Sequence, residues 1–201
     1  MGTAAAPVVP KSAVKHPPRK RASTPPTTLA AFVHWKAEDG FKYEWNNGVI
    51  EKSLKMITPQ NFYLVRKLTH LLKEAKSSQT GMLICEAGNM TSANQLRIPD
   101  IAYYTDAEIS QAAQSATWPI TAFAIEIISE NDKINKVYKK LEEYFHAGVK
   151  VVWLIFPQLE TVYVYTAPEQ VTICKGNGIC SAEKVIPDFV ISAEKLFDRS
   201  I

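Results

Sequence analysis

The stretch 97–156 constrains the fold of this chain most, because it holds two single acids in runs that are otherwise apolar. Asp100 lies in Ile-Pro-Asp-Ile-Ala (98–102), and Glu126 lies in Phe-Ala-Ile-Glu-Ile-Ile (123–128). A carboxylate is costly to bury without a partner, so an apolar strand that keeps one acid usually keeps it for a purpose. Two such strands close together in the sequence predict that both acids face one site.

The spacing of small residues around the two acids supports one shared site. Alternate side chains of a strand share a face, so Ala122 and Ala124 lie beside Glu126, and Ala102 lies beside Asp100. These neighbours leave room for an ion and a substrate oxygen, and a hard cation is a common partner of such acids. The alternative is that each acid caps a helix or ends a strand, and the pattern alone leaves both interpretations open.

Several short motifs, taken in order, resemble the Uma-two family of restriction endonucleases within the PD-(D/E)XK nuclease superfamily. The central motifs are Pro99-Asp100, Glu126 to Ser129, Lys140 to Tyr144, Gly148-Val149 and Trp153-Leu154; the flanking ones are Tyr43-Glu44 before Gly48, Ile186 to Phe189, and Leu196-Phe197. The resemblance covers roughly residues 29 to 201. It implies an α/β fold, with a restriction-endonuclease-like mixed β-sheet flanked by helices in a single domain.

The resemblance also implies an activity, which is metal-dependent hydrolysis of phosphodiester bonds by an endonuclease acting on DNA. Asp100, Glu126 and the backbone carbonyl of Ile127 are expected to hold the ion, and such oxygen ligands suit Mg²⁺ or Mn²⁺. Lys140 is expected to orient or help deprotonate the attacking water and to offset transition-state charge. Glu44 is expected to act as an outer ligand or to hold a metal-bound water.

Three positions depart from the family or superfamily pattern. The superfamily lysine lies two residues after the Glu, where this chain has Ile128, and the matching lysine on the following helix is Lys140. The early His of the family corresponds to Asn61, and the Pro after the Ser corresponds to Glu130. The alternative function is therefore a catalytically silent nucleic-acid-binding or assembly module on the same fold.

Charge is distributed unevenly along the chain. Residues 1–28 hold five basic and no acidic residues and six of the twelve prolines, which predicts a disordered basic tail. The remaining 18 basic and 20 acidic residues exclude a broadly basic DNA-binding surface. Positive charge must then be local, and the predicted helix after Glu126 holds Lys133, Lys136, Lys139 and Lys140. Such a row is usually a solvated face, and only the family motif selects Lys140.

Composition narrows the location and the partners. No run approaches the 18 or so apolar residues that a membrane helix needs, so we expect no membrane partner. The three cysteines lack metal-ligand spacing and are expected to be buried or incidental thiols in a reducing cytoplasm. Nucleic acid is the expected partner, and a second copy of the chain, as a homodimer, is retained as a further candidate.

Periodicity and turn residues predict the elements. The helices expected are 29–35, one opening at Thr58-Pro59, 106–114, and one capped by Asn131 or Asp132 that ends at Gly148. The strands expected are a hairpin over 43–50 around Asn47-Gly48, 81–90, 95–104, 121–128, 149–156, 161–165 at a sheet edge, and a short strand after Gly178. The side chains expected to face inward include Val33, Phe62 and Ile134.

Overall fold

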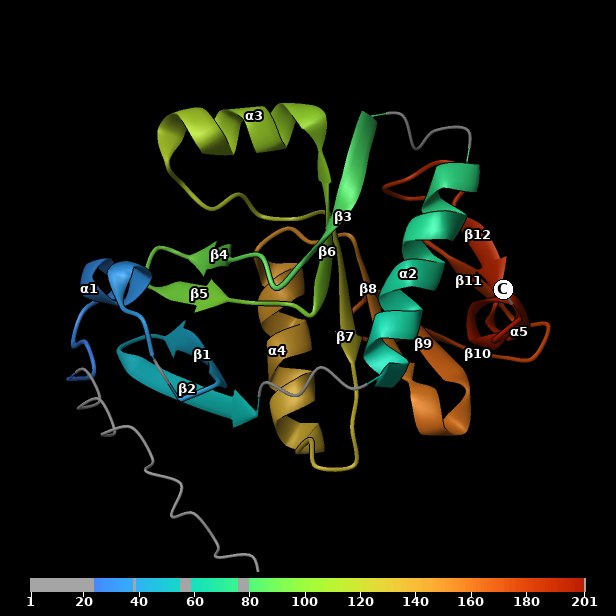
Figure 1. Cartoon of the computed structure of the whole chain (residues 1–201), viewed down its shortest axis with the longest axis horizontal. Coiled ribbons are helices and arrows are strands. Elements are labelled where there is room, and N and C mark those ends of the chain that lie inside the picture. Colours follow the sequence, from blue (N-terminus) through green and yellow to red (C-terminus); the bar gives the residue numbers. More distant parts are fainter. Residues whose placement is uncertain (1–23, 38, 55–58, 76–79, 201) are drawn as a thin grey trace, which may run out of the picture.

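A computed structural model describes residues 24–37, 39–54, 59–75 and 80–200. Figure 1 shows the arrangement of its elements. The helices are α1 (Leu29–His34), α2 (Pro59–Glu74), α3 (Asp106–Ser115), α4 (Ile134–His146) and α5 (Ala193–Phe197), with the 3₁₀ turn η2 (Pro157–Leu159). The strands are β1 (Phe41–Asn46), β2 (Val49–Leu54), β3 (Gly81–Cys85), β4 (Asn89–Ser92), β5 (Gln95–Arg97), β6 (Ile101–Thr105), β7 (Phe123–Ile127), β8 (Val151–Phe156), β9 (Thr161–Ala167), β10 (Gln170–Lys175), β11 (Ile179–Ser181) and β12 (Val190–Ser192).

The strands form one large mixed sheet and two smaller antiparallel ones. The central sheet has the order β10-β9-β8-β7-β6-β3, in which β7 and β8 pair in parallel and are connected by α4. The second sheet has the order β2-β1-β5-β4, and β11 pairs with β12. This architecture confirms the predicted α/β class, with a mixed sheet flanked by helices.

The central sheet is covered on both faces, as Figure 1 shows. Phe123 and Ile125 of β7 point into the core that contains leucines of α2 and Leu196 of α5. Ala124, the residue between them, points into the opposite core, which contains Leu141 of α4. The alternation predicted for this strand is confirmed, and the Ala124 face is the face that Glu126 shares.

The β1–β2 hairpin has the predicted turn. Asn47 and Gly48 both have positive φ angles, 51° and 89°, which an Asn-Gly turn between two twisted strands requires. The hairpin is extended by β5 through the pairs Trp45–Leu96 and Asn46–Gln95. The second sheet therefore contains Arg97, where the 97–156 stretch begins, and this sheet lies beside α4 (Figure 1).

Two long strands predicted over 81–90 and 95–104 are each divided in the structure. The first is interrupted at Glu86, which has a left-handed backbone with φ 51°. The second is interrupted at Pro99, which has no N–H to donate to a sheet ladder. In both places the chain changes from one sheet to the other, and Asp100 consequently lies in the bend before β6 rather than inside a strand.

Three side chains predicted to face inward are exposed, which makes those predictions wrong. Val33 is 41% exposed, Phe62 is 63% exposed and Ile134 is 48% exposed. Phe62 and Ile134 lie in the first turns of α2 and α4, and burial in those helices falls on later turns. In α2 the buried positions are Leu64, Leu68, Leu71 and Leu72.

The ends of α4 and the sheet edge also differ from expectation. Asp132 does not cap α4, because its Oδ2 accepts hydrogen bonds from the N–H and hydroxyl of Ser129, each at 2.7 Å. Lys133 occupies the N-cap position without a side-chain bond, whereas Gly148 ends the helix with φ 103° as predicted. β9 lies inside the central sheet, and the strand at that edge is β10, which the sequence pattern did not predict.

The predicted tail and the predicted cap Thr58 fall largely outside the described residues. Residues 1–23 are not described, and Thr28 at the end of the tail accepts a hydrogen bond from Ala31 N–H at 3.2 Å as the cap of α1. The division into a tail (1–28) and a nuclease-like domain (29–201) stays a prediction. Across the described ranges, no helix is both long and apolar enough to span a membrane.

Candidate active site

A cleft of about 760 Å³ opens between the β1–β2 hairpin, the start of α2, one side of α4, and the ends of β6 and β7. All the side chains that the sequence selected line this cleft, namely Asp100, Glu126, Lys140 and Glu44, and so does Ile127. The structure therefore brings together residues that are up to 96 positions apart in the sequence.

Asp100 is held by two contacts of different kinds. Its Oδ1 accepts a hydrogen bond from Lys42 Nζ at 2.8 Å, and its Oδ2 accepts one from the backbone N–H of Ile127, also at 2.8 Å. The second contact follows from the sheet, because Ile101 lies opposite Ile125 in the β6–β7 pair. Asp100 is thus fixed beside the end of the strand that carries Glu126.

Lys140 is the lysine of α4 that reaches the acids. Its Nζ lies 2.8 Å from Glu44 Oε1, 2.8 Å from Glu126 Oε1 and 3.4 Å from the carbonyl oxygen of Ile98. An ammonium has three N–H donors, so these contacts occupy all of them. Lys136, by contrast, lies exposed on the rim of the cleft.

Glu126 is buried beside a phenol and an ammonium. Its Oε1 accepts a hydrogen bond from Tyr144 Oη at 2.6 Å and contacts Lys140. Burial raises the pKa of Glu126, and the neighbouring Asp100 charge adds to this rise, whereas the Lys140 cation opposes it. Among the described residues both contacts fall on Oε1, which leaves Oε2 available to a ligand.

Glu44 is held in the charged form although it is buried. Burial alone favours its neutral form, but the cations of Lys140, Lys42 and Arg97 together lower its pKa to about 2. Its Oε1 also accepts the backbone N–H of Ile98 at 2.6 Å, and its Oε2 contacts Arg97 Nη1 at 3.2 Å. Glu44 therefore connects the hairpin to the strand end that leads to Asp100.

We expect Glu44 to make the stability of the protein fall in acid. Its pKa is about 2 in the folded protein, against 4.5 for a free side chain, so its contribution is complete above about pH 4.5 and disappears as the pH falls towards 2. The contribution is on the order of 3 kcal/mol. Urea unfolding of metal-free protein between pH 3 and 7 measures it.

In the same titration, Glu44→Gln should remove this part of the pH dependence. Glu142→Gln, which alters an exposed acid of α4, should leave the pH dependence of the wild type. Parallel curves for wild type and Glu44→Gln would contradict the assigned electrostatics.

Several residues that contact the acids of the cleft are not among the site residues predicted from the sequence. Lys42 contacts Asp100, and Tyr144 contacts Glu126. Arg97 contacts Oε2 of Glu44, the oxygen that Lys140 does not contact. Arg97 carried a usable signal, since it is a single cation between Leu96 and Ile98. Tyr144 also had a signal, because it ends the Lys140 to Tyr144 motif. Lys42 had none, because its contact depends on how the two sheets meet.

The donor set fits a hard divalent ion. Asp100 and Glu126 supply carboxylate oxygens on one wall of the cleft, which is the ligand type that Mg²⁺ and Mn²⁺ prefer. Within the described ranges no three His, Cys, Asp or Glu side chains are clustered as a metal site. A site here would therefore rest on two carboxylates, backbone and water, as Mg²⁺ sites commonly do.

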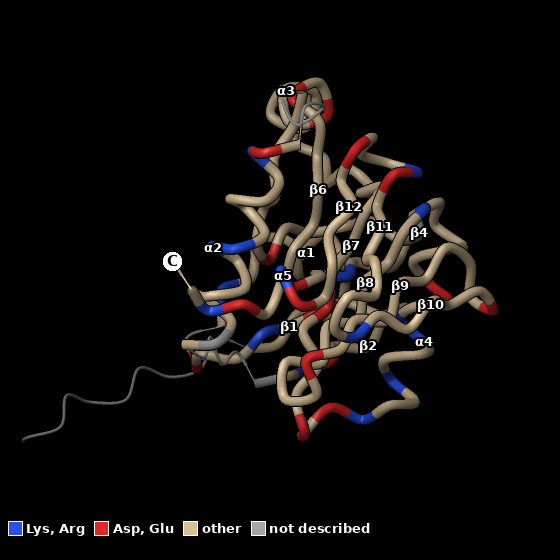
Figure 2. The backbone as a smooth tube through the Cα atoms, turned by 90° about the vertical axis from the view of Figure 1, so that its right-hand side faces the viewer, with Lys and Arg blue, Asp and Glu red and all other residues tan. Residues whose placement is uncertain are grey.

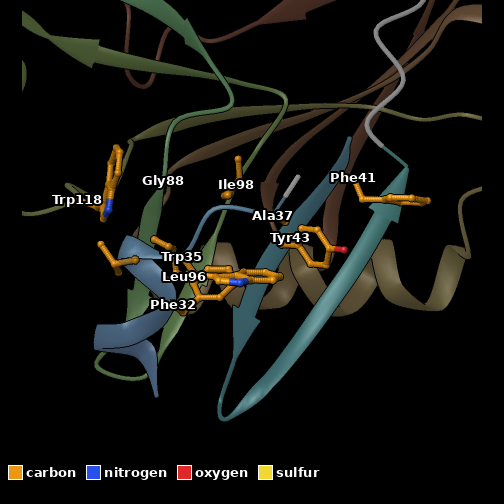
Figure 3. Close-up of a pocket in the computed structure, with 10 residues that line it drawn as sticks. Phe32, Trp35, Ala37, Phe41, Tyr43, Gly88, Leu96, Ile98 and Trp118 are labelled. Atoms are coloured by element: carbon orange, nitrogen blue, oxygen red, sulfur yellow. The ribbon is translucent and has the colours of Figure 1, made fainter. Parts of the chain in front are cut away.

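A second, aromatic pocket of about 250 Å³ lies on the other face of β1 (Figure 3). Phe41 and Tyr43 line this pocket, whereas Lys42 and Glu44, which alternate with them along β1, line the cleft that holds Asp100 and Glu126. Phe32, Trp35 and Trp118 complete its aromatic lining. The pocket contains none of the residues selected from the sequence.

Charges of both signs are interspersed over the backbone in Figure 2. Lys52, Lys133 and Lys136 line the outer part of the cleft, and the acids Glu86 and Asp132 line it as well. The expectation that any basic surface is local and belongs partly to α4 stays a prediction.

The fold is that of a restriction-endonuclease-like nuclease. It matches the crystal structure described as "a putative nuclease belonging to DUF820 from Anabaena variabilis ATCC 29413", with a TM-score of 0.70, 19% identity, and coverage of 86% of this chain and 98% of that chain. The sequence profile of the Uma2 family, described as "Putative restriction endonuclease", matches residues 29–194. The chain belongs to the Uma2 family. No functionally curated protein shows a significant match.

Proposed function

We propose that this protein is a divalent-metal-dependent endonuclease that hydrolyses phosphodiester bonds in DNA. The observation that carries the proposal is the convergence of Asp100, Glu126 and Lys140 in one cleft, with Lys140 Nζ 2.8 Å from Glu126 Oε1. Membership of the Uma2 family supports the nuclease class. The cleft geometry adds a carboxylate pair and a fixed ammonium, which are the groups that this chemistry needs.

Asp100, Glu126 and the carbonyl of Ile127 would hold the ion. In an extended strand the N–H and C=O of one residue point to the same side, and the N–H of Ile127 points to Asp100, so its carbonyl is expected on that side too. A bound Mg²⁺ or Mn²⁺ supplies charge neutralisation at the phosphate and lowers the pKa of a bound water.

The net charge of the ionised side chains around the proposed site supports the binding of a divalent ion. Five acids belong to this group, namely Asp100, Glu126, Glu44, Glu51 and Glu143, and three cations, Lys42, Lys140 and Arg97. When all are ionised, two negative charges remain, which one divalent ion balances. Glu126 is the member whose pKa is raised by burial, so an ion beside it would favour its charged form.

Lys140 would act on the water and on the phosphate. Its weakest contact is the 3.4 Å bond to the Ile98 carbonyl, so exchanging that bond for a water or a phosphate oxygen costs least. Glu44 would orient the ammonium through its 2.8 Å contact. A fixed ammonium near the reacting phosphate stabilises the charge that develops in the transition state.

The rim of the cleft supports a nucleic-acid substrate. Lys52, Lys133 and Lys136 can bind phosphates, and the exposed Phe62 on the opposite helix offers a face on which a base can stack. We assign DNA as the substrate and include a homodimer in the proposal, because two copies of the site could cut the two strands of a duplex in one encounter. The three free thiols of the described residues suit a cytoplasmic location.

A substrate panel tests this function. Purified protein is incubated with supercoiled plasmid, single-stranded DNA and RNA, in EDTA and with Mg²⁺ or Mn²⁺. We expect ion-dependent nicking or linearisation of the plasmid. Cleavage of RNA alone would show that the substrate is RNA rather than DNA. If the protein binds DNA but cleaves none of the substrates, the silent nucleic-acid-binding module is favoured.

Lys140→Met should lower the cleavage rate roughly 100-fold to 1,000-fold, the effect of removing one donor that stabilises transition-state charge. Binding of Mn²⁺ should remain, because the carboxylates stay in place. Lys139→Met removes the same charge from an exposed neighbour on α4 and is expected to cleave within about threefold of wild type. Equal rates for the two variants would remove Lys140 from the mechanism.

A further inference from the structure

Lys42 is a buried ammonium in the cleft that neither the family motifs nor the proposed mechanism uses. It lies on β1, two residues before Glu44, so both side chains leave the strand on the face of the acids. Its Nζ is 2.8 Å from Asp100 Oδ1, and its side chain is 11% exposed. The contact crosses from the small sheet to the end of the central sheet.

The two contacts of Asp100 differ in how readily they can be exchanged. The bond from Ile127 N–H is part of the packed β6–β7 region and keeps Oδ2 in place. The bond from Lys42 comes from a flexible four-carbon side chain. An ion that binds Asp100 can therefore displace the ammonium without disturbing the sheet.

Lys42 and Lys140 are held very differently. Lys140 has three acceptors, one on each of three segments of the chain. Among the described residues the hydrogen bond recorded for Lys42 goes to Asp100 alone, which leaves two of its three donors for another anion. Lys140 is thus a fixed ammonium, and Lys42 is one that can change partners.

We propose that Lys42 occupies the position on Asp100 that a divalent ion takes, and that the displaced ammonium then binds a phosphate of the nucleic acid. The inference rests on the proposed function, since it needs an ion at Asp100 and a phosphate in the cleft. An ammonium and a divalent ion repel each other at one carboxylate oxygen, so Lys42 lowers the affinity of the empty cleft for ions. A bound phosphate gives the displaced charge a new partner.

This exchange couples ion binding to substrate binding. Substrate makes the release of Asp100 by Lys42 less costly, so it raises ion affinity, and by linkage the ion raises substrate affinity by the same factor. The cleft would then bind its ion mainly when nucleic acid is present. A lysine that only stabilised the fold would produce no such coupling.

Calorimetry of Ca²⁺ binding tests the inference, with and without a saturating DNA duplex whose integrity is checked on a gel. Lys42→Met should tighten Ca²⁺ binding without DNA roughly tenfold, because the competitor is gone. The factor by which DNA tightens Ca²⁺ binding should fall roughly tenfold relative to wild type. Lys42→Arg, which keeps the charge, should restore most of that factor, and Lys139→Met should match wild type within about twofold.

Three other outcomes would each contradict a specific step of this proposal or of the proposed function. Wild-type values of both quantities in Lys42→Met would overturn the inference and leave the nuclease proposal standing. Tighter ion binding with an unchanged DNA factor would overturn the transfer of Lys42 to phosphate. Absence of Ca²⁺ binding to wild type, with DNA as well as without it, would contradict the proposed function itself. If Lys42→Met does not fold, as judged by circular dichroism, Lys42→Gln replaces it in both titrations.

Discussion

Asp100→Asn and Glu126→Gln are each expected to lower Mg²⁺-dependent cleavage at least roughly 1,000-fold. Each change removes one ligand charge while nearly keeping the shape of the side chain, so ion binding and water activation are lost together. Initial rates of plasmid nicking at saturating Mg²⁺ measure the effect. An exposed acid of α4, changed as Glu142→Gln, is the matched control and should retain the wild-type rate.

The two variants should differ in stability without metal. Glu126→Gln replaces a carboxylate whose pKa is raised by burial, so its free energy of unfolding should change by less than about 1 kcal/mol. Asp100→Asn leaves the buried ammonium of Lys42 without its carboxylate, which should cost about 1–3 kcal/mol. Full activity in a well-folded Asp100→Asn or Glu126→Gln protein would exclude that residue as an ion ligand.

Arg97→Met is expected to cause the largest loss of stability, about 3–5 kcal/mol. The Arg97 side chain is 2% exposed, and its guanidinium contacts Glu143 at 2.6 Å, Glu51 at 2.9 Å and Glu44 at 3.2 Å. Removing it leaves three acids close together without their shared cation, and the contacts that hold β5 to the hairpin and to α4 are lost. Urea unfolding at pH 7 measures the change.

Two further arginine variants control this experiment. Arg66→Met alters an exposed arginine of α2 and should change stability by less than about 0.5 kcal/mol. Arg97→Lys keeps a charge but not the planar fork that contacts several carboxylates, so an intermediate loss is expected. A loss below about 1 kcal/mol for Arg97→Met would show that the cluster contributes little to folding.

Sequence pattern predicted the elements that have strong local signals. The Asn47-Gly48 turn, α3 and the β7–α4–β8 unit formed where periodicity and turn residues placed them. The pattern failed where the chain changes sheets, as at Glu86 and Pro99, because two short strands with apolar residues read as one. It also missed β10, in which exposed Val171 and Ile173 lie on an edge.

The candidate site divides in the same way. Asp100 and Glu126 were predictable because an acid in an apolar run is a local signal, and their convergence follows from the β6–β7 pairing. Lys140 could be selected over Lys136 only through the family motif. The partners of Lys42 and Arg97 could not be predicted, because their contacts depend on the pairing of β1 with β5 and on how the small sheet meets the central one.

Calorimetric titration of Ca²⁺ into metal-free wild type and Glu126→Gln, in the presence of an intact DNA duplex, tests the central claim most directly. It asks whether Asp100 and Glu126 hold an ion in the cleft where Lys140 lies. We predict one Ca²⁺ per chain for wild type and at least roughly 100-fold weaker binding for Glu126→Gln, because one of two carboxylate ligands loses its charge. Equal affinity in the two proteins, or no binding to wild type, would contradict the account.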